Sequence, residues 1–306
     1  MSDETRTVDG HEIEFSNLDK VLFPDAGITK GDVVDYYERI ADVMLPHMED
    51  RIVSMHRWPD GIDGGDFYQK DVPDHFPDWI RSVEVDKEDG TLRQVVVDDR
   101  ATLVYLAQQA CLTPHVWLSR TDARRKPDRM IFDFDPSDDW EEAFDEVRCA
   151  ARRLRSLLED ELELKSFVMT SGSRGLHIHV PLVPEDDFDA VRAFAGEVAR
   201  VLEDRHPDRL TTAQRKDKRG DRVFIDILRN AYAQTAVAPY SIRARPGAPV
   251  ATPLEWDELS RSGMSPRAYT LKNLFRRLGR KDDPWSGMDR HRRSLTGPRD
   301  TLGGLA

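Results

Sequence analysis

The sequence of 306 residues predicts a mixed α/β protein, and two observations support that prediction. Short apolar runs of strand length alternate with longer segments whose apolar residues recur at three-to-four spacing. Residues 130–228 also follow the order strand–helix–strand–strand–helix–strand, which is typical of a split βαβ, RRM-like module. We therefore expect two modules packed against each other. The first is an α/β module over 1–125, and the second covers 126–306 and ends in a basic helical segment.

One long helix and several strands are predicted for the first module. Strand-like runs lie at 52–55, 92–97 and 115–118, and residues 101–112 have the pattern of a helix. Thr29 is a suitable N-cap for an earlier helix with apolar residues at Val33, Val34, Tyr37, Ile40 and Val43.

The second module begins with an apolar strand at 130–134 and continues with a helix from about residue 140 to 162. Further strands are expected at 167–170, 176–180 and 223–227, and a second helix at 188–202. A last strand is expected at 240–243.

The composition is that of a soluble globular protein, with 39% hydrophobic and 33% charged residues. No stretch has the length of a membrane span, and residues 1–9 are polar, unlike a signal peptide. We expect a cytoplasmic protein with no membrane partner. Cys111 and Cys149 lie far apart without a CxxC pair, so we expect two buried, unpaired thiols and no zinc site.

The net charge of -12 at first argues against a nucleic-acid partner, but the charge is unevenly distributed. Residues 211–222 contain five basic residues and two acids, and residues 267–293 contain nine basic residues and three acids. Local basic patches determine the affinity for phosphate, so a protein with a negative net charge can still bind DNA. The second stretch either binds DNA or packs as a solvated helix. The preference for Asp and Arg fits either a salty cytoplasm or a GC-rich genome.

Three aspartates are candidate metal ligands. Asp133 and Asp135 are two residues apart on a strand, so both side chains point to one face of the sheet. Neighbouring carboxylates repel unless they are neutralised, and Mg²⁺ or Mn²⁺ is the simplest neutraliser. Asp226 lies in an apolar run, where a charge is costly unless it is paired or bound to metal. Together the three predict a site for two divalent ions that supports nucleotidyl transfer.

Each of these carboxylates also has a structural alternative. Asp135 is placed to cap the following helix, and Asp226 could pair with Arg222 or Arg243. The combination of all three favours the metal site.

A glycine-containing turn links the strands at 167–170 and 176–180. Ser171, Gly172, Ser173 and Arg174 offer hydroxyls, close backbone approach and a guanidinium, which suit a phosphate chain, although the Walker A spacing is absent. His177 and His179 share one face of the next strand. Such a pair either binds a metal or is satisfied by hydrogen bonds, and we expect His177 to contact a nucleotide.

These motifs together resemble those of the archaeo-eukaryotic primase superfamily. They are most similar to the polymerase domain of bacterial DNA ligase D and its stand-alone relatives in non-homologous end joining. The resemblance rests on residues 133–136, the turn at 171–177 and Asp226. Segments 17–24, 30–32, 57–61 and 238–243 extend it over roughly residues 11–275.

The resemblance implies a template-dependent polymerase that fills DNA ends with NTPs or dNTPs, accepts ribonucleotides readily and uses two Mn²⁺ or Mg²⁺ ions. Asp133, Asp135 and Asp226 match the metal ligands. Lys20 and Lys30 match a pocket for the DNA 5′-phosphate, and Phe67 and Tyr68 match an aromatic pair that stacks on template bases. Nucleotide contacts are implied for His56, His115, Ser171, Arg174, His177, Arg219 and Arg243.

Three positions depart from the family pattern. His56 stands where a nucleotide-holding lysine is expected, and a neutral imidazole would weaken that contact. Arg174 replaces a common lysine and preserves its charge, whereas Arg229 replaces a frequent polar amide. These departures affect the expected nucleotide affinity and leave the reaction class unchanged.

The sequence contains neither a ligase nucleotidyl-lysine motif nor a nuclease module, so we expect a separate DNA ligase and a Ku-like protein as partners. A de novo primase is an alternative, although a zinc-stem cysteine cluster is missing. A non-catalytic DNA-end-binding scaffold is a second alternative, in which the costly buried acids would be unused. A phosphoesterase built on His177 and His179 would need further ligands.

Overall fold

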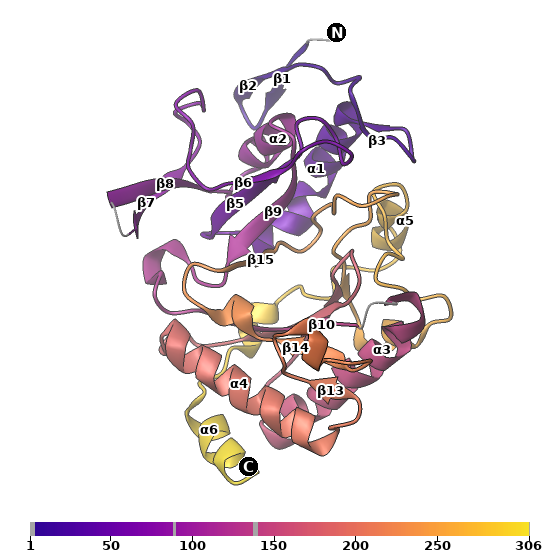
Figure 1. Cartoon of the computed structure of the whole chain (residues 1–306). Helices are drawn as coiled ribbons and strands as arrows, with labels where there is room; N and C mark the ends of the chain where they lie inside the picture. The colour runs from indigo at the N-terminus through magenta and orange to yellow at the C-terminus, as the bar shows by residue number, and fades with distance from the viewer. Residues whose placement is uncertain (1–3, 88–89, 137–139, 306) are drawn as a thin grey trace. The chain divides into compact units, whose positions relative to one another are not determined.

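The computed structural model describes residues 4–87, 90–136 and 140–305 (Figure 1). The chain forms two compact units, and each is assembled from several segments. Unit 1 comprises Met1–Asp122, Thr235–Ala251 and Tyr269–Arg277. Unit 2 comprises Ala123–Gln234, Thr252–Ala268 and Leu278–Ala306. The division expected from the sequence, 1–125 and 126–306, treats each module as one continuous segment, whereas here the chain returns to unit 1 twice.

Unit 1 is built on a sheet with the strand order β15-β9-β5-β8-β7, and β6 also pairs with β5. These strands are β5 (Ile52–Arg57), β6 (Phe67–Gln69), β7 (Ser82–Lys87), β8 (Gly90–Val96), β9 (Cys111–Trp117) and β15 (Thr235–Val237). Two hairpins complete the strands of this unit: β1 (Glu4–Val8) with β2 (His11–Phe15), and β3 (Val21–Phe23) with β4 (Ile28–Thr29).

Helix α1 (Lys30–Met44) packs against α2 (Arg100–Gln108) in unit 1. The predicted cap of α1 is confirmed, because Thr29 Oγ1 accepts a hydrogen bond from Asp32 N at 3.2 Å. Asp32 Oδ2 in turn accepts from Thr29 N at 2.8 Å, which completes a capping box. The predicted apolar face is buried in the core, with Val43 only half-buried.

Two predictions at the edges of unit 1 are wrong, for the same backbone reason. The helix expected over 101–112 ends at Gln108, because Ala110 has a φ of 57° and Cys111 begins β9. The strand expected at 240–243 is absent, because Tyr240 has a φ of 66° and the chain turns there. The strand of that region is β15, which ends at Val237.

Unit 2 contains the predicted split βαβ arrangement. Its sheet has the order β13-β14-β10-β12-β11-β16, and β14, β10, β12 and β11 pair antiparallel as in an RRM-like module. The strands are β10 (Arg129–Asp135), β11 (Phe167–Thr170), β12 (Leu176–Pro181), β13 (Leu210–Thr211), β14 (Val223–Asp226) and β16 (Pro253–Leu254).

Helices α3 (Trp140–Ser156) and α4 (Phe188–Arg205) both contact β10, and Figure 1 shows them on the same face of the sheet. The helix expected to reach residue 162 changes to a π-helical turn at Leu157–Glu161, and α4 runs three residues beyond its predicted end. The C-terminal part of the chain carries only short helices, α5 (Leu274–Leu278) and α6 (Thr296–Gly303).

Across residues 4–87, 90–136 and 140–305, no helix is both long and apolar enough to cross a membrane. Both cysteines are free, as expected. Cys111 is buried, and this burial raises the pKa of its thiol to about 12. Cys149 is exposed on α3, so the expectation that both thiols are buried is wrong for this residue.

Candidate active site

The sheet of unit 2 brings the three candidate metal ligands together along two neighbouring strands. Asp133 and Asp135 lie on β10, and Asp226 is the last residue of β14. Asp133 is the direct cross-strand partner of Asp226. Directly opposed residues of antiparallel strands project to the same face, so all three side chains share one face of the sheet.

The carboxyl groups themselves engage different neighbours. Asp133 Oδ1 lies 3.3 Å from His177 Nε2, and His177 is its cross-strand partner on β12. Asp226 Oδ1 accepts a hydrogen bond from Leu228 N at 2.7 Å. The other ring nitrogen of His177, Nδ1, is buried and has no hydrogen-bond partner in the described part of the chain. It is therefore a polar atom still available to a ligand.

The pKa values of Asp135 and Asp226 are both raised, so the ionised forms of these carboxyl groups are disfavoured. Burial and the neighbouring Asp133 raise the pKa of Asp135 from 3.8 to about 6, against the opposing effects of Arg174 and His177. Burial also raises the pKa of Asp226, and Asp133 adds to that shift, whereas the Leu228 amide, Arg229 and Arg219 oppose it. Ionised carboxylates here need a cation to offset their burial and mutual repulsion.

The chemistry of these donors fits a hard divalent cation, which prefers carboxylate oxygens. Among the residues that the structure describes, however, no three His, Cys, Asp or Glu side chains are already gathered into a metal-binding cluster. The backbone register is in place, while Asp133 faces His177 and Asp226 faces its own turn. The alternative that Asp135 caps the following helix involves residues 137–139, which lie outside the described residues.

The glycine-containing turn lies directly against the tip of β10. Ser171 Oγ accepts hydrogen bonds from Ser173 N at 3.2 Å and Gly175 N at 3.0 Å, and thereby holds the turn in shape. A Cβ atom built on Gly175 would lie 1.8 Å from the carbonyl oxygen of Phe134, which only glycine can tolerate. Arg174 is near enough to lower the pKa of Asp135. The turn and the carboxylates therefore form one constellation.

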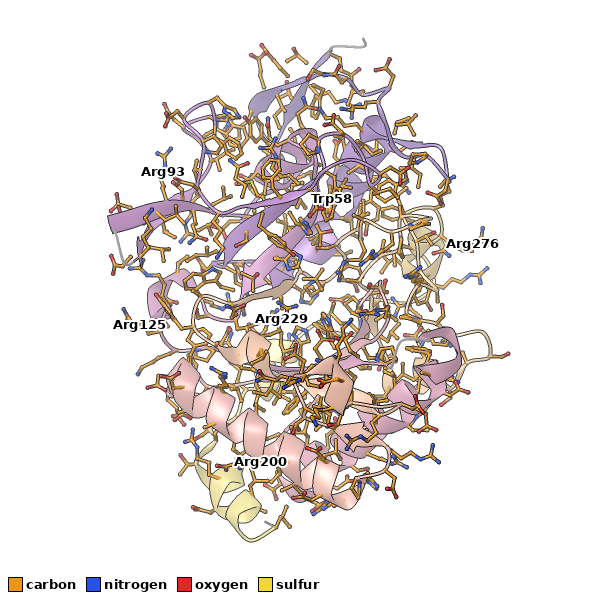
Figure 2. The ribbon with its side chains drawn as sticks, in the orientation of Figure 1. Trp58, Arg93, Arg125, Arg200, Arg229 and Arg276 are labelled. Carbon is orange, nitrogen blue, oxygen red and sulfur yellow. The ribbon has the colours of Figure 1, made fainter. Side chains whose placement is uncertain are left out.

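Arg219 and the basic residues around it are largely occupied with the backbone. The Arg219 guanidinium donates to the carbonyl oxygens of Ala213 and Gln214 and lies 3.6 Å from the ring centroid of Phe224. Arg222 donates to the carbonyl oxygens of Arg219 and Lys218, so it is not placed as the structural partner considered for Asp226. Arg229, labelled in Figure 2, follows β14 and acts electrostatically on Asp226.

A second group of predicted residues clusters in unit 1 around His56. Its ring stacks on Tyr68 at a centroid distance of 3.9 Å and lies 3.6 Å from Trp58, which is labelled in Figure 2. His56 Nε2 lies 2.7 Å from Asp66 Oδ2, and the ring of His115 is 5.4 Å from that of Tyr68. Burial lowers the pKa of His56, which the Asp66 carboxylate partly offsets. Arg243 belongs to the same unit and also lowers this pKa.

The remaining predicted DNA contacts are also in unit 1. Phe67 and Tyr68 are 46% and 53% exposed, so both side chains are partly open to solvent. The backbones of Lys20 and Lys30 are hydrogen-bonded, with Lys30 N donating to Lys20 O at 2.8 Å. Lys20 pairs with Asp60 at 2.7 Å, and the buried Lys30 ammonium donates to the carbonyl oxygen of Ser16. The two lysines are thus adjacent, and each has a local partner.

Sequence reasoning did not identify two residues that support these groups. Asp66 holds the ring of His56, and Asn230 bonds to the backbone of β10. Neither role can be predicted from the sequence, because Asp66 lies in an irregular loop and Asn230 contacts a strand that is distant in the sequence.

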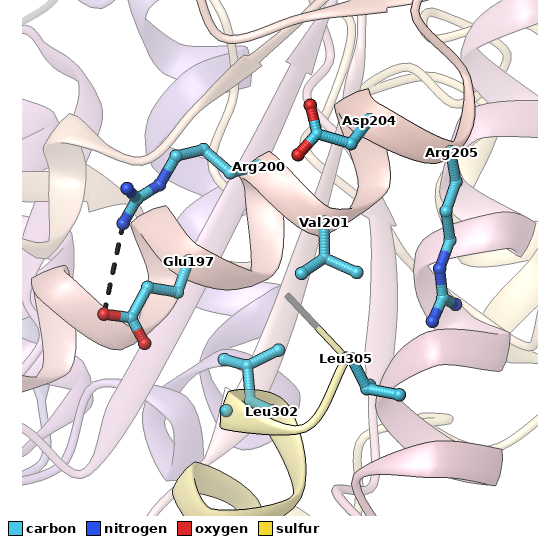
Figure 3. Close-up of a pocket in the computed structure, with 8 residues that line it drawn as sticks. Glu197, Arg200, Val201, Asp204, Arg205, Leu302 and Leu305 are labelled. Atoms are coloured by element: carbon cyan, nitrogen blue, oxygen red, sulfur yellow. Dashed lines mark ion pairs between the residues drawn. The ribbon is translucent and has the colours of Figure 1, made fainter.

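A pocket of about 560 Å³ lies elsewhere in unit 2, between α4 and α6 (Figure 3). Its lining combines Val201, Leu302 and Leu305 with charged residues of α4, including an Arg200–Glu197 pair at 4.0 Å. None of the predicted site residues lines it, so it is separate from the carboxylate group.

Comparison with known proteins shows extensive similarity. The family model described as "LigD, primase-polymerase domain" matches residues 29–285. The multifunctional non-homologous end joining protein LigD of Mycolicibacterium smegmatis is 36% identical over 250 residues, covering 81% of this chain and 32% of that protein. The bifunctional non-homologous end joining protein LigD of Bacillus subtilis is 31% identical over 277 residues, covering 90% and 44% respectively.

Among solved structures, the polymerase domain from Mycobacterium tuberculosis ligase D in complex with DNA matches with a TM-score of 0.85 and 33% identity. The match covers 91% of this chain and 98% of that chain. By contrast, the chain spans only about a third of the length of the mycobacterial LigD proteins (32% and 37%).

Proposed function

Because the chain belongs to the LigD primase-polymerase domain family, and is thus a nucleotidyltransferase of the primase-polymerase type, we propose that it fills DNA ends by templated nucleotide addition during non-homologous end joining. The observation that carries the proposal is the cross-strand pairing of Asp133 with Asp226, with Asp135 beside them on β10. This arrangement supports the proposal, because three acids suited to bind metal ions share one face of the central strands.

Membership of this family implies the use of divalent metal ions. We assign their binding to Asp133, Asp135 and Asp226, with two Mn²⁺ or Mg²⁺ ions as the expected cofactors. When bound, such ions activate a 3′-hydroxyl and stabilise a leaving pyrophosphate. The raised pKa of Asp135 and of Asp226 supports this assignment, because burial, and after it the neighbouring Asp133, disfavours their ionised forms unless a cation is bound.

The residues of unit 2 that surround the carboxylates are suited to a nucleoside triphosphate. Arg174 and Arg219 supply positive charge close to Asp135 and Asp226. Ser171 shapes the turn, and His177 has a buried ring nitrogen that a ligand can satisfy. We assign these four residues to the triphosphate and sugar of the incoming nucleotide, which includes ribonucleotides.

The residues of unit 1 are suited to DNA. Tyr68 and Phe67 expose aromatic faces on which unpaired template bases can stack. Lys20 and Lys30 are assigned to a DNA 5′-phosphate, and His56, His115 and Arg243 to the nucleotide. A Ku-like end-binding protein and a DNA ligase activity are the expected partners, because added nucleotides must be followed by sealing of the strand.

The test is nucleotide addition on a gapped duplex with a 5′-phosphate, with Mn²⁺ or Mg²⁺ and each NTP and dNTP. Asp226→Ala removes one predicted ligand, and Asp208→Ala is its control, because Asp208 is an exposed acid of the same unit. Templated addition by the wild type and by Asp208→Ala, but not by Asp226→Ala, is expected. DNA binding without addition under all conditions would favour an end-binding scaffold, and addition by Asp226→Ala would refute the assigned site.

A further inference from the structure

We propose that Asn230 is a positioning residue for the carboxylate site, because its side-chain amide fastens the segment after β14 to β10 and so keeps Asp226 opposite Asp133. The inference rests on the proposed function in one respect, namely that these carboxylates bind divalent ions.

The Asn230 side chain is fully buried, and its amide makes three hydrogen bonds, one accepted by Oδ1 and two donated by Nδ2. Its Oδ1 accepts from Ile131 N at 2.8 Å, and its Nδ2 donates to Ile131 O at 2.7 Å. Nδ2 also donates to Ile227 O at 2.9 Å. A backbone N–H can only donate and a carbonyl can only accept, so these partners fix the orientation of the amide.

The need for this amide follows from the length of β14. The ladder between β10 and β14 runs from Asp135 and Phe224 to Asp133 and Asp226, where it stops. If the same register continued for two more residues, Ile131 would face Leu228. Leu228 instead begins a 3₁₀ turn, so this pair does not form. The N–H and C=O of Ile131 are buried and require partners. Asn230 supplies both, so its side chain replaces the missing rung of the sheet.

This rung lies next to the paired carboxylates. Ile131 is two residues before Asp133, and Asn230 closes the turn that begins immediately after Asp226. Asp226 also holds this turn, through the bond from Leu228 N to its Oδ1. That bond occupies a carboxylate oxygen that a cation also requires. Asn230 holds the same turn through its own amide group, so the carboxylate oxygens of Asp226 can bind a cation without the turn being released.

The inference is tested by Mn²⁺ binding to metal-free protein, measured by calorimetry well below the unfolding temperature of each variant. Asn230→Leu removes the amide while keeping a similar side-chain volume. The control is Ser166→Ala, which removes a hydrogen bond of another buried side chain of unit 2, from Ser166 Oγ to Glu159 Oε1 at 2.8 Å. We expect about a tenfold higher Mn²⁺ dissociation constant for Asn230→Leu and no change for Ser166→Ala, even where both unfold at lower temperature.

A second readout needs no metal. Amide hydrogen exchange of Ile131 and Leu228 should accelerate in Asn230→Leu and not in Ser166→Ala. If Asn230→Leu does not fold, Asn230→Ser is measured with the same criteria. Wild-type Mn²⁺ affinity in the folded Asn230 variant, together with loss of binding in Asp226→Ala, would refute the positioning role and leave the metal site intact. Absence of Mn²⁺ binding by the wild type would overturn the metal site and the inference together.

Discussion

Gly175 is constrained by the backbone of a neighbouring strand rather than by its own conformation. A Cβ on this residue would approach the Phe134 carbonyl oxygen to 1.8 Å, far inside van der Waals contact. Phe134 lies between Asp133 and Asp135 on β10. A side chain at position 175 therefore has to displace the strand that carries two of the carboxylates.

Gly175→Ala is accordingly expected to lower the free energy of unfolding by about 1–3 kcal/mol and to abolish most nucleotide addition. Thermal unfolding and the gap-filling assay measure the two effects. Gly196→Ala on α4 is the control, because its Cβ would meet no atom within 4 Å beyond its chain neighbours and the adjoining backbone of its own helix, and alanine favours helix. Normal activity of Gly175→Ala would mean that β10 tolerates this displacement.

The raised pKa of Asp135 predicts how the stability of the metal-free protein depends on pH. The carboxyl group ionises at about 3.8 in the unfolded chain and at about 6 in the folded one. Its contribution to folding is therefore fully present below pH 4 and is lost as the pH rises through 6. The loss is up to about 3 kcal/mol, since one pKa unit is worth about 1.4 kcal/mol.

The measurement is thermal unfolding in EDTA from pH 4 to pH 7 for the wild type and Asp135→Asn. Relative to the variant, the wild type should lose stability over this range, and Mn²⁺ at pH 7 should restore it. A constant difference between the two proteins across the range would show that Asp135 ionises normally.

At the residue scale, the sequence allowed candidate site residues to be identified where the residue type itself indicates the chemistry, as it does for an acid within an apolar strand. Asp133 and Asp226 could be singled out because each acid stands in an apolar strand, whereas their direct opposition across the sheet is known only from the structure. Asn230 and Asp66 could not be found in this way, because their partners are set by a turn and by a loop. The assigned roles of the individual site residues remain predictions.

The hairpin of β5 and β6 is the element that presents aromatic surface. Pairing of His56 with Tyr68 across this hairpin allows their rings to stack, and Asp66 fixes the imidazole from the connecting loop. Tyr68 thus has one face against His56 while the residue remains 53% exposed. Because His56 already holds the Tyr68 ring in place, less side-chain entropy is lost when a template base stacks on that ring.

Tyr68→Ala should weaken binding of gapped DNA with unpaired template bases about tenfold, as expected for the loss of one base–aromatic stack. Tyr68→Phe is the matched control and should bind like the wild type, because the ring is retained. Fluorescence anisotropy with gapped and fully paired duplexes measures the effect. An equal loss for both duplexes would contradict template stacking.

At the element scale, helices and strands with regular apolar spacing were predicted correctly, including the RRM-like order of unit 2. Besides the shifted ends of α3 and α4, the errors occurred at Ala110 and Tyr240, where non-glycine residues adopt positive φ. Neither alanine nor tyrosine favours that conformation, so the local sequence does not predict the end of α2 or the turn at Tyr240. Long-range packing determines both.

The whole molecule carries 57 acids against 45 basic residues, which predicts a strong response to salt. Self-repulsion is screened by KCl, so the unfolding temperature should rise between low and about 1 M KCl. DNA binding should weaken over the same range, because phosphate contacts are screened as well. Unfolding scans with KCl and, as a control for excluded-volume effects, with sucrose test this expectation. A flat or falling unfolding temperature in KCl would contradict it.

The interleaving of the two units bears on how such a chain can be inherited. The backbone passes between them five times, at residues 122, 234, 251, 268 and 277. No single crossover point in a gene can therefore take one whole unit from one parent and the other whole unit from the second parent, and a chimaera joined at one position within 1–306 mixes the two parents within at least one unit. The two units should consequently be inherited together, and a functional exchange between related proteins should replace both at once.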